Sequence, residues 1–324
     1  MKKNKEFKKR INLNVPLKYV SNLVLSQYSL GEFVSNRTIY LGYGDFSFAL
    51  TTTTGKYLVK IINKETPTTL CQSIVDRYFK PSQNKNIHCP KVYTTKQNKN
   101  MMVFKIKDVE YRLFVMEYLK GNDLYSMHYE LSASDLQKIA EQLAHINQVK
   151  FKPEFIYDDW AIESFNKEFK KNNKKIDENI SKQIKFWKNK FDAVDFEKLP
   201  KSFIHGDVVD MNIMYNNKEF YIVDFSSANY QSRLSDVATS IADLCFVKGN
   251  LNATKTNIKL FVDAYNSVQP LNAYEKENLL TFVAIGNIIG YLNTLKFSGK
   301  YNTMVKHRYM ENLNQLDKLK TLKI

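Results

Sequence analysis

The stretch that most constrains this chain covers residues 204–225 and reads IHGDVVDMNIMYNNKEFYIVDF. It contains two short strand-like runs joined by a polar turn. This arrangement places Asp207, Asn212 and Asp224 on the two runs. Phosphoryl transfer needs a carboxylate near an acceptor hydroxyl, together with amide and carboxylate oxygens that hold Mg²⁺ on a nucleotide. The stretch therefore predicts a site suited to phosphoryl transfer.

Each polar residue of this stretch has an expected role. Asp207 is placed to accept or orient the proton of an attacking hydroxyl. Asn212, five residues on, can turn back toward a metal ion that Asp207 does not bind, and Asp224 can bridge Mg²⁺ to the phosphates. We expect His205 to be structural, with a ring that hydrogen-bonds to backbone and pins the loop.

A second motif lies in the first third of the chain. Gly42 and Gly44 lie in LGYGDFSFAL, and Lys60 lies in LVKI on a following strand. Glycines in a turn let the backbone approach a phosphate closely, because no Cβ intervenes. A lysine on the next strand can then reach the phosphates. A glycine pair of this kind is usually only a turn, but together with residues 204–225 it indicates a nucleotide site.

The pattern of apolar residues predicts two lobes. Residues 1–120 read as a small β-rich N-lobe, with strands and a helix over 68–79. Residues 121–324 read as a larger, mainly helical C-lobe that contains the catalytic loop and the acceptor site. The expected class is therefore α+β and bilobal.

Composition excludes several other classes of protein. The formal net charge is +15, but its excess is concentrated in two basic runs, 1–10 and 167–190, that lack interleaved stacking aromatics. Solvated surfaces explain these runs, so we expect no specific nucleic-acid partner. Three cysteines, odd in number and without a CxxC pair, argue against a disulfide framework. His88 and Cys89 have no second half that would complete a zinc site.

Neither a secretory signal nor a membrane span is expected. The basic start is not followed by an apolar region. The apolar stretch 281–297 is short for a span and contains Asn287 and Asn293, so it predicts a buried helix. We expect a cytoplasmic protein that does not bind membranes, and the sequence does not specify its oligomeric state.

These motifs resemble those of the aminoglycoside phosphotransferase/choline kinase superfamily, which is related to protein kinases. The family loop HGDxxxxN is HGDVVDMN here, and VDF stands where the family has aspartate followed by an aromatic residue. EYLKG, LPKSFIHGD and RLSDVATSIADLC also have counterparts in the family. The segments VDAYNSVQPLNAYEKENL and SQYSLGEFVS are most similar to type II homoserine kinases. The resemblance implies a protein-kinase-like bilobal fold.

The resemblance also implies roles for individual residues, with ATP and Mg²⁺ as cofactors. Asp207 would be the catalytic base, Asn212 and Asp224 the Mg²⁺ ligands, and Lys60 the contact to the α- and β-phosphates. The backbone that would receive adenine belongs to Glu117, Tyr118 and Leu119.

Two features differ from the family pattern, and a third, Asp236, agrees with it. A helical glutamate usually pairs with the strand lysine, yet residues 68–79 contain none. Gln72 and Asp76 are the nearest candidates, and Asp76 could serve with a shorter reach. Asp210, within Val-Asp-Met where antibiotic kinases often have His-Pro-Gly, either contacts an amino group of the acceptor or faces solvent. Asp236 matches a family aspartate that braces the catalytic loop.

The leading hypothesis is an ATP-dependent kinase that phosphorylates a hydroxyl of a small metabolite, either homoserine-like or an amino alcohol. An aminoglycoside or choline phosphotransferase is one alternative. For choline, Tyr157, Trp160 and Trp187 could contribute to an aromatic cage, although core packing explains them equally well. A non-catalytic nucleotide-binding pseudo-kinase is the main alternative from another class, and an RNA-associated protein is the third.

Overall fold

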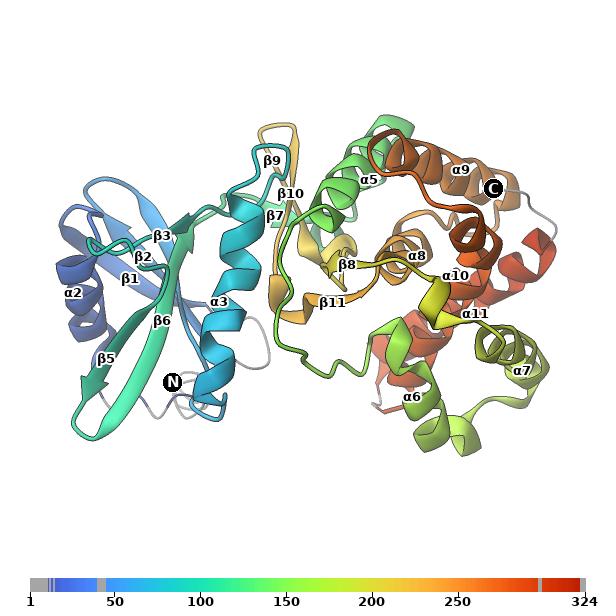
Figure 1. Cartoon of the computed structure of the whole chain (residues 1–324), viewed down its shortest axis with the longest axis horizontal. Helices are drawn as coiled ribbons and strands as arrows, with labels where there is room; N and C mark the ends of the chain where they lie inside the picture. Colours follow the sequence, from blue (N-terminus) through green and yellow to red (C-terminus); the bar gives the residue numbers. More distant parts are fainter. Residues whose placement is uncertain (1–10, 12, 14, 40–44, 297–298, 321–324) are drawn as a thin grey trace. The chain divides into compact units, whose positions relative to one another are not determined.

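The computed structural model describes residues 11, 13, 15–39, 45–296 and 299–320, and the chain divides into two compact units, Met1–Gly121 and Asn122–Ile324. In Figure 1 the first unit is built around an antiparallel sheet and the second is mainly helical. This confirms the predicted α+β class, with a small β-rich N-terminal part and a larger helical C-terminal part.

The N-terminal unit contains one sheet in the order β1-β2-β3-β6-β4, with β5 also paired to β6. All of its strand pairs are antiparallel. Its elements are α2 (Leu17–Gln27), β1 (Phe33–Ile39), β2 (Phe46–Thr52), β3 (Lys56–Ile61), α3 (Thr68–Ser82), β4 (Val92–Tyr93), β5 (Met102–Ile106) and β6 (Val109–Glu117).

The two faces of this sheet carry different residues, because successive side chains of a strand point to opposite faces. On one face Val59 joins α2 in a buried apolar cluster, to which α2 contributes Val20 and Val24. On the other face Lys60 of β3 lies in register with Phe114 of β6. Helix α3 packs on this second face, since the ring of its Tyr78 lies 5.2 Å from that of Phe114. The sheet thus presents Lys60 toward α3.

The C-terminal unit is mainly helical and also contains two small antiparallel sheets, one of three strands and one of two. Its α-helices are α4 (Leu124–Met127), α5 (Ala133–Asn147), α6 (Phe165–Asn172), α7 (Glu178–Asp192), α8 (Arg233–Leu244), α9 (Leu251–Val268), α10 (Ala273–Thr294) and α11 (Lys300–Leu319). Its strands are β7 (Asn122–Asp123), β8 (Lys201–Ile204), β9 (Ile213–Asn216), β10 (Glu219–Ile222) and β11 (Asn229–Ser232). Its 3₁₀ turns are η1 (Ile162–Ser164), η2 (Asn173–Lys175), η3 (Phe196–Lys198), η4 (Asp210–Asn212) and η5 (Phe225–Ser227).

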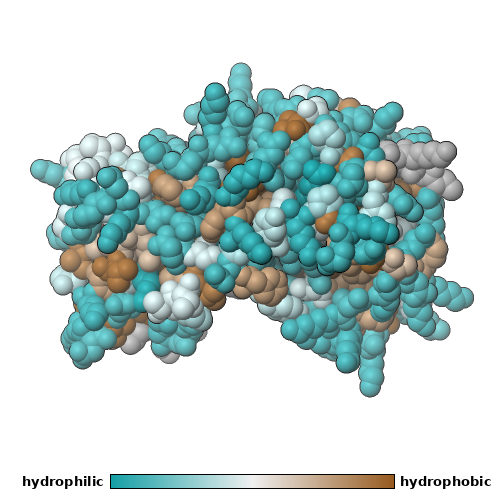
Figure 2. Space-filling model, viewed as in Figure 1, coloured by the Kyte–Doolittle hydropathy of each residue, from teal (hydrophilic) through white to brown (hydrophobic). Residues whose placement is uncertain are grey.

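Helix α10 is the buried helix expected from the apolar stretch, although it begins eight residues earlier than that stretch. Asn287 is satisfied within the fold, since it donates to the carbonyl of Val283 at 3.0 Å and accepts from Asn312 at 2.9 Å. Asn293 donates to the carbonyl of Asp159 at 3.1 Å. Among the described residues, no helix combines the length and the apolar character that a membrane crossing needs. In the view of Figure 2, hydrophilic side chains cover most of the surface and hydrophobic ones form small patches.

Two ribbons of the C-terminal unit carry the stretch 204–225. Strands β9 and β10 form a hairpin, with Asn217 and Lys218 at positive φ in its turn. Such turns match the right-handed twist of the strands they connect. Strand β8 pairs with β11, in a separate ribbon. The loop after β8 and the segment after β10 therefore both connect one ribbon to the other.

Candidate active site

The loop after β8 and the segment after β10 lie against each other. Val223 links them, because its N–H donates to the carbonyl of Asn212 at 2.9 Å and its own carbonyl bonds to the ring of His205 at 3.0 Å. Gly206 has φ of 84°, and a Cβ at this position would meet the carbonyl oxygen of Ser227 at 2.9 Å. Only glycine fits so close an approach. These contacts bring Asp224 beside the loop that carries Asp207 and Asn212.

Asn212 and Asp207 are in direct contact. The Asn212 Nδ2 donates to the Asp207 Oδ2 at 2.7 Å and to the Asp207 carbonyl oxygen at 2.9 Å. The amide is thereby oriented with its nitrogen toward Asp207. Because the nitrogen of this amide is occupied, its oxygen is the atom that can bind a cation.

Asp224 lies in a strained backbone conformation, with φ of 63° and ψ of 68°. Few residues adopt the left-handed region, but aspartate and asparagine do so more readily than most. Its carboxylate accepts a hydrogen bond from the N–H of Ser226. The conformation turns the chain sharply at the end of β10, where the sequence predicted a metal ligand.

Acidic neighbours surround Asp207. Desolvation of this carboxyl, followed by the negative charges of Asp158 and Asp224, raises the pKa of Asp207 to about 7. The hydrogen bond from Asn212 acts in the opposite direction, because it favours the charged form. A carboxylate whose pKa lies near neutrality is suited to accept a proton at physiological pH.

Asp236 of α8 supports the loop after β8 through hydrogen bonds, and its side chain is fully buried. Its carboxylate accepts from the backbone N–H of His205 at 2.9 Å, from that of Gly206 at 2.8 Å and from the Asn147 amide at 2.8 Å. Asp236 thus holds the loop by its backbone, in agreement with the bracing role expected for it.

His205 is likewise placed for a structural role. The N–H of Asp207 donates to the His205 Nδ1 at 3.2 Å, so the Nε2 carries the proton and donates to the Val223 carbonyl. Burial lowers the pKa of this imidazole, which favours the neutral ring that both bonds require.

Replacing Asp236 by asparagine is expected to lower the free energy of unfolding by about 3 kcal/mol, because the amide NH₂ would face at least one of these three hydrogen-bond donors in a buried site. Urea denaturation with fluorescence detection measures the change. Asp263→Asn on α9 is a matched control at an exposed position and should be near neutral. An Asp236→Asn variant as stable as the parent would contradict the bracing role.

Both the backbone and the carboxylate of Asp210 have partners within the fold. Its N–H donates to Asp243 at 2.8 Å, and its carboxylate lies 3.8 Å from the guanidinium of Arg308. Arg308, on α11, also pairs with Asp243 at 2.9 Å. Desolvation and the charge of Asp243 raise the pKa of Asp210, whereas Arg308 lowers it. The open question about this residue is thus answered in part by an internal ion pair, and contact with an acceptor stays a prediction.

Among the described residues of the N-terminal unit that were predicted to bind nucleotide, Lys60 lies on β3, Glu117 ends β6, and Tyr118 and Leu119 follow β6. Gly42 and Gly44 fall outside the described residues. The N–H of Glu117 is occupied, because it donates to the carbonyl of Lys91 at 2.8 Å. Within the described part of the chain, the N–H and C=O of Leu119 form no backbone hydrogen bond. Leu119 is therefore the better candidate of the predicted adenine contacts.

Tyr118 lies in the same segment, and the Nζ of Lys56 lies 3.8 Å from the centre of its ring. This contact involves the side chain of Tyr118, whereas the predicted adenine contact involves its backbone.

The expectation that Asp76 could pair with Lys60 is wrong. Asp76 accepts from the amides of Gln72 at 3.0 Å and Asn100 at 2.6 Å, so it is engaged at another part of α3. Lys60 instead donates to the hydroxyl of Tyr78 at 2.7 Å and lies 3.5 Å from the carboxylate of Asp45. Tyr78 lies further along α3 than Asp76, and its longer side chain reaches over Phe114 to the lysine.

Comparison with known proteins decides the family. The model of the phosphotransferase enzyme family (APH) matches residues 36–269. The chain belongs to this family. The predicted membership of the aminoglycoside phosphotransferase/choline kinase superfamily is thereby confirmed, and this phosphotransferase contains the family loop at Asp207 and Asn212. No curated protein sequence matches the chain.

Solved structures share the fold of this phosphotransferase at low sequence identity. An amicoumacin kinase in complex with AMP-PNP, Ca²⁺ and Ami has a TM-score of 0.67 and 13% identity, covering 97% of this chain and 96% of that one. An aminoglycoside phosphotransferase from Alicyclobacillus acidocaldarius has a TM-score of 0.64 and 15% identity, covering 95% and 96%. A choline kinase from Cryptosporidium parvum has a TM-score of 0.62 and 14% identity, covering 94% and 97%. These matches confirm the kinase-like fold.

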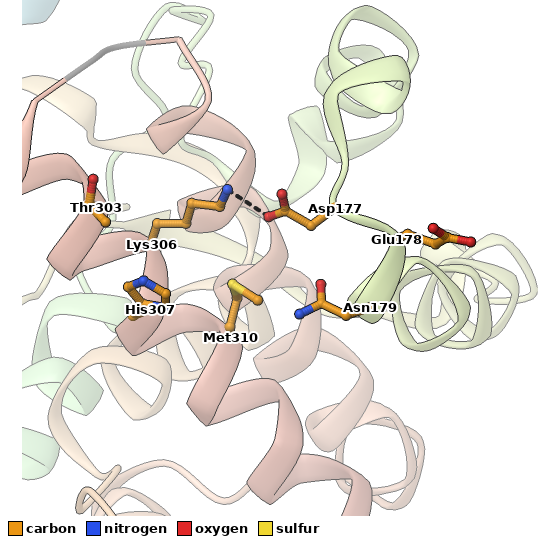
Figure 3. Close-up of a pocket in the computed structure, with 7 residues that line it drawn as sticks. All are labelled: Asp177, Glu178, Asn179, Thr303, Lys306, His307 and Met310. Atoms are coloured by element: carbon orange, nitrogen blue, oxygen red, sulfur yellow. Dashed lines mark ion pairs between the residues drawn. The ribbon is translucent and has the colours of Figure 1, made fainter.

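A cavity of the phosphotransferase lies away from the predicted residues. Its volume is about 430 Å³, and side chains from the start of α7 and from α11 line it (Figure 3). The Lys306 Nζ lies 2.6 Å from the Asp177 carboxylate across this cavity. None of the predicted site residues lines it. It therefore contributes nothing to the assignment of the site.

Sequence reasoning missed several residues around the two motifs. Asp158, Asp243 and Arg308 surround the catalytic loop, and Tyr78 and Asp45 surround Lys60. Asp243 lies in a segment that has a family counterpart, which was a usable signal. Asp45 lies within LGYGDFSFAL, but the pattern gave it no role. The others lie outside the motifs, and only the folded chain brings them to the site.

Proposed function

We propose that this phosphotransferase transfers the γ-phosphoryl group of ATP to a hydroxyl of a small metabolite, with Asp207 as the catalytic base. The arrangement of Asp207 carries the proposal: a partly buried carboxylate, oriented by the Asn212 amide and placed beside Asp224. An acceptor hydroxyl that binds near Asp207 would give its proton to this carboxylate as the oxygen attacks phosphorus.

Asn212 and Asp224 have the chemistry of a magnesium site. Both offer oxygen ligands, and the Asn212 oxygen is the end of the amide directed away from Asp207. Among the described residues, no three His, Cys, Asp or Glu side chains converge on one point. This fits a metal that is held by few protein ligands together with phosphate oxygens and water. Bound Mg²⁺ would supply positive charge that neutralises the phosphates during transfer.

The nucleotide would bind through Lys60 and the backbone at the end of β6. Lys60 would contact the α- and β-phosphates, and the N–H and C=O of Leu119 supply the donor and acceptor that an adenine edge requires. The amicoumacin kinase structure is a complex with AMP-PNP and Ca²⁺, which supports a nucleotide and a divalent cation for this chain.

The charges around the loop favour an amino alcohol as acceptor. Among the described residues with the largest effects on the pKa of Asp207 and Asp210, several are acidic, including Asp158 and Asp243, and Arg308 is a cation that offsets them in part. An ammonium group bound there would compensate the excess of negative charge. A homoserine-like acceptor would satisfy the same requirement through its amino group.

An aromatic cage for choline has less support. Trp187 is buried in the core, with 1% of its surface exposed. Tyr157 donates its hydroxyl to Glu168 at 2.5 Å, and the Nζ of Lys167 lies 3.9 Å from the centre of its ring. A lysine of the chain itself thus occupies the position that a quaternary ammonium would need.

Activity is expected to depend on one ionisation near neutral pH. Because the pKa of Asp207 is raised to about 7, the base is protonated at lower pH, and kcat/KM should fall about tenfold per pH unit below that value. Steady-state rates from acid to alkaline pH, with nucleotide saturating, measure the profile. Asp210→Asn should keep the same midpoint within about one pH unit. A rate that stays constant across neutrality would contradict the role of Asp207.

The same ionisation should affect stability with a definite sign. The folded carboxyl of Asp207 holds its proton up to about pH 7, whereas the unfolded one releases it near the ordinary pKa of 3.8. Rising pH between these values therefore destabilises the folded state. Asp207→Asn should reduce this slope, and the part that remains includes that of Asp210, whose pKa is also raised. Thermal unfolding midpoints at several pH values compare the two proteins.

The proposed function is tested by incubating the protein with MgATP and a panel of hydroxyl compounds. The panel contains homoserine, ethanolamine, aminopropanol, choline, an aminoglycoside and a neutral sugar. Formation of ADP that depends on one of the amine-bearing alcohols is the expected result. Binding of nucleotide without turnover on any compound would favour the non-catalytic module instead.

A further inference from the structure

Among the groups that contact Lys60, two come from different parts of the described N-terminal unit. Its Nζ donates to the Tyr78 hydroxyl at 2.7 Å, and the Nζ lies 4.9 Å from the centre of the Tyr78 ring. The carboxylate of Asp45, the residue before β2, lies 3.5 Å from the same Nζ. The side chains of Lys60 and Asp45 are only 14% and 18% exposed, so water screens their attraction less than at an open surface.

The position of Tyr78 follows from the sheet. Lys60 lies between Ser47 of β2 and Phe114 of β6 in the strand register. The Tyr78 ring packs on Phe114, with the centroids 5.2 Å apart, and 4% of Tyr78 is exposed. A ring packed in this way has little rotamer freedom, so its hydroxyl is fixed beside the lysine.

The position of Asp45 is fixed by the backbone. Its Oδ1 accepts from the N–H of Asn63 at 3.0 Å, which ties the start of β2 to the segment after β3. The Asp45 carboxylate thus makes two contacts. Its Oδ1 binds the backbone of the segment after β3, and its Oδ2 faces Lys60.

We propose that Tyr78 and Asp45 together are positioning residues that hold Lys60 toward the phosphates of the nucleotide, in place of a helical glutamate. The inference rests on the proposed function, in which Lys60 binds those phosphates. A hydroxyl accepts a hydrogen bond without carrying a charge, so Tyr78 directs the ammonium while leaving its positive charge available. Asp45 lies farther from the Nζ and adds a weaker electrostatic restraint.

This arrangement has a functional consequence. A lysine without partners would lose conformational entropy on meeting the phosphates, whereas a held lysine has already lost it. Absence of the helical glutamate is therefore compatible with an active phosphotransferase. The competing explanation is that Lys60, Tyr78 and Asp45 only stabilise the sheet and do not affect the nucleotide.

Tyr78→Phe separates these explanations, because it removes the hydroxyl and keeps the ring on Phe114. Binding of MgADP and of adenosine is measured by calorimetry in the full-length protein. We expect Tyr78→Phe to weaken MgADP about fivefold, as the loss of one hydrogen bond that positions Lys60 implies, and to leave adenosine unchanged. Tyr57→Phe is the matched control, since it removes a hydroxyl that bonds to Thr54 in the same sheet, and it should bind MgADP as the parent does.

The coupling to Lys60 is tested in a second background. Lys60→Met alone should weaken MgADP about tenfold or more, and adding Tyr78→Phe to it should change the affinity less than about twofold. A Tyr78→Phe variant with parental MgADP affinity, or with the same loss in both backgrounds, would overturn the inference. A Lys60→Met variant with parental affinity would instead refute the role of Lys60 in the proposed function.

Asp45→Asn provides an independent measurement if Tyr78→Phe fails to fold. The asparagine oxygen can still accept from the N–H of Asn63, so the anchor remains while the charge is lost. Weaker binding of MgADP, with unchanged binding of adenosine, is the expected result. Unchanged binding of MgADP would remove Asp45 from the proposal.

Discussion

Replacing Asp207 by asparagine is expected to lower kcat for phosphoryl transfer by about a thousandfold, since an amide cannot accept the proton of the acceptor hydroxyl. Binding of MgADP should change little, because the proposed phosphate contact is Lys60 and the proposed metal ligands are Asn212 and Asp224. Calorimetry with MgADP and single-turnover assays with the acceptor identified from the panel measure the two properties separately.

Asparagine is the informative replacement at this position. It keeps an oxygen that can accept from the Asn212 amide, so the loop geometry is preserved. Asp177→Asn is a suitable control, because Asp177 is another hydrogen-bonded carboxylate that accepts from Tyr291 at 2.8 Å but lies outside the catalytic loop. Its kcat should match that of the parent protein. Turnover of the Asp207→Asn variant within tenfold of the parent would show that Asp207 is not the base.

Replacing Asp224 by asparagine is expected to abolish the Mg²⁺ dependence of nucleotide binding and to lower turnover by about a thousandfold. Asp224 is the charged one of the two proposed metal ligands, so its replacement by a neutral amide weakens the attraction for Mg²⁺. Titrations of ADP at increasing Mg²⁺ concentration measure the dependence, since the parent protein should bind ADP more tightly as Mg²⁺ rises.

The backbone at Asp224 determines which control is valid. Its φ of 63° is tolerated by asparagine, whereas alanine would add strain at the same position. Asp224→Asn therefore tests the charge, and a comparison with Asp224→Ala gives the contribution of strain. If Asp224→Asn keeps the parental response to Mg²⁺, the ligand assignment is incorrect.

Local sequence patterns were sufficient to predict most of the fold. The alternation of apolar residues and the glycine turns indicated the N-terminal sheet, and helical periodicity indicated α5, α8, α9 and α10. The apolar stretch before residue 297 was correctly predicted as a buried helix, because Asn287 and Asn293 within it ruled against a membrane span. The 3₁₀ turns and the pairing of β8 with β11 depend on tertiary contacts and could not be predicted.

The motifs predicted which residues of the site would meet, but not how they are supported. The spacing of Asp207, Asn212 and Asp224 pointed to one centre, and the structure brings the loops that carry them together through Val223 and Gly206. The motifs did not predict the partners of Lys60. The family pattern led to the expectation of a helical acid beside Lys60, and a tyrosine on an amphipathic helix is ordinarily a core residue.

The most direct test of the central proposal follows the phosphoryl group itself. Phosphorus NMR of the protein with MgATP and each compound of the panel should show loss of the γ-phosphate signal and a new phosphomonoester signal, in equal amounts, for at least one amino alcohol. The Asp207→Asn protein should show neither change over the same time. Parent protein that binds nucleotide yet forms no phosphomonoester with any of these compounds would contradict the proposed kinase activity.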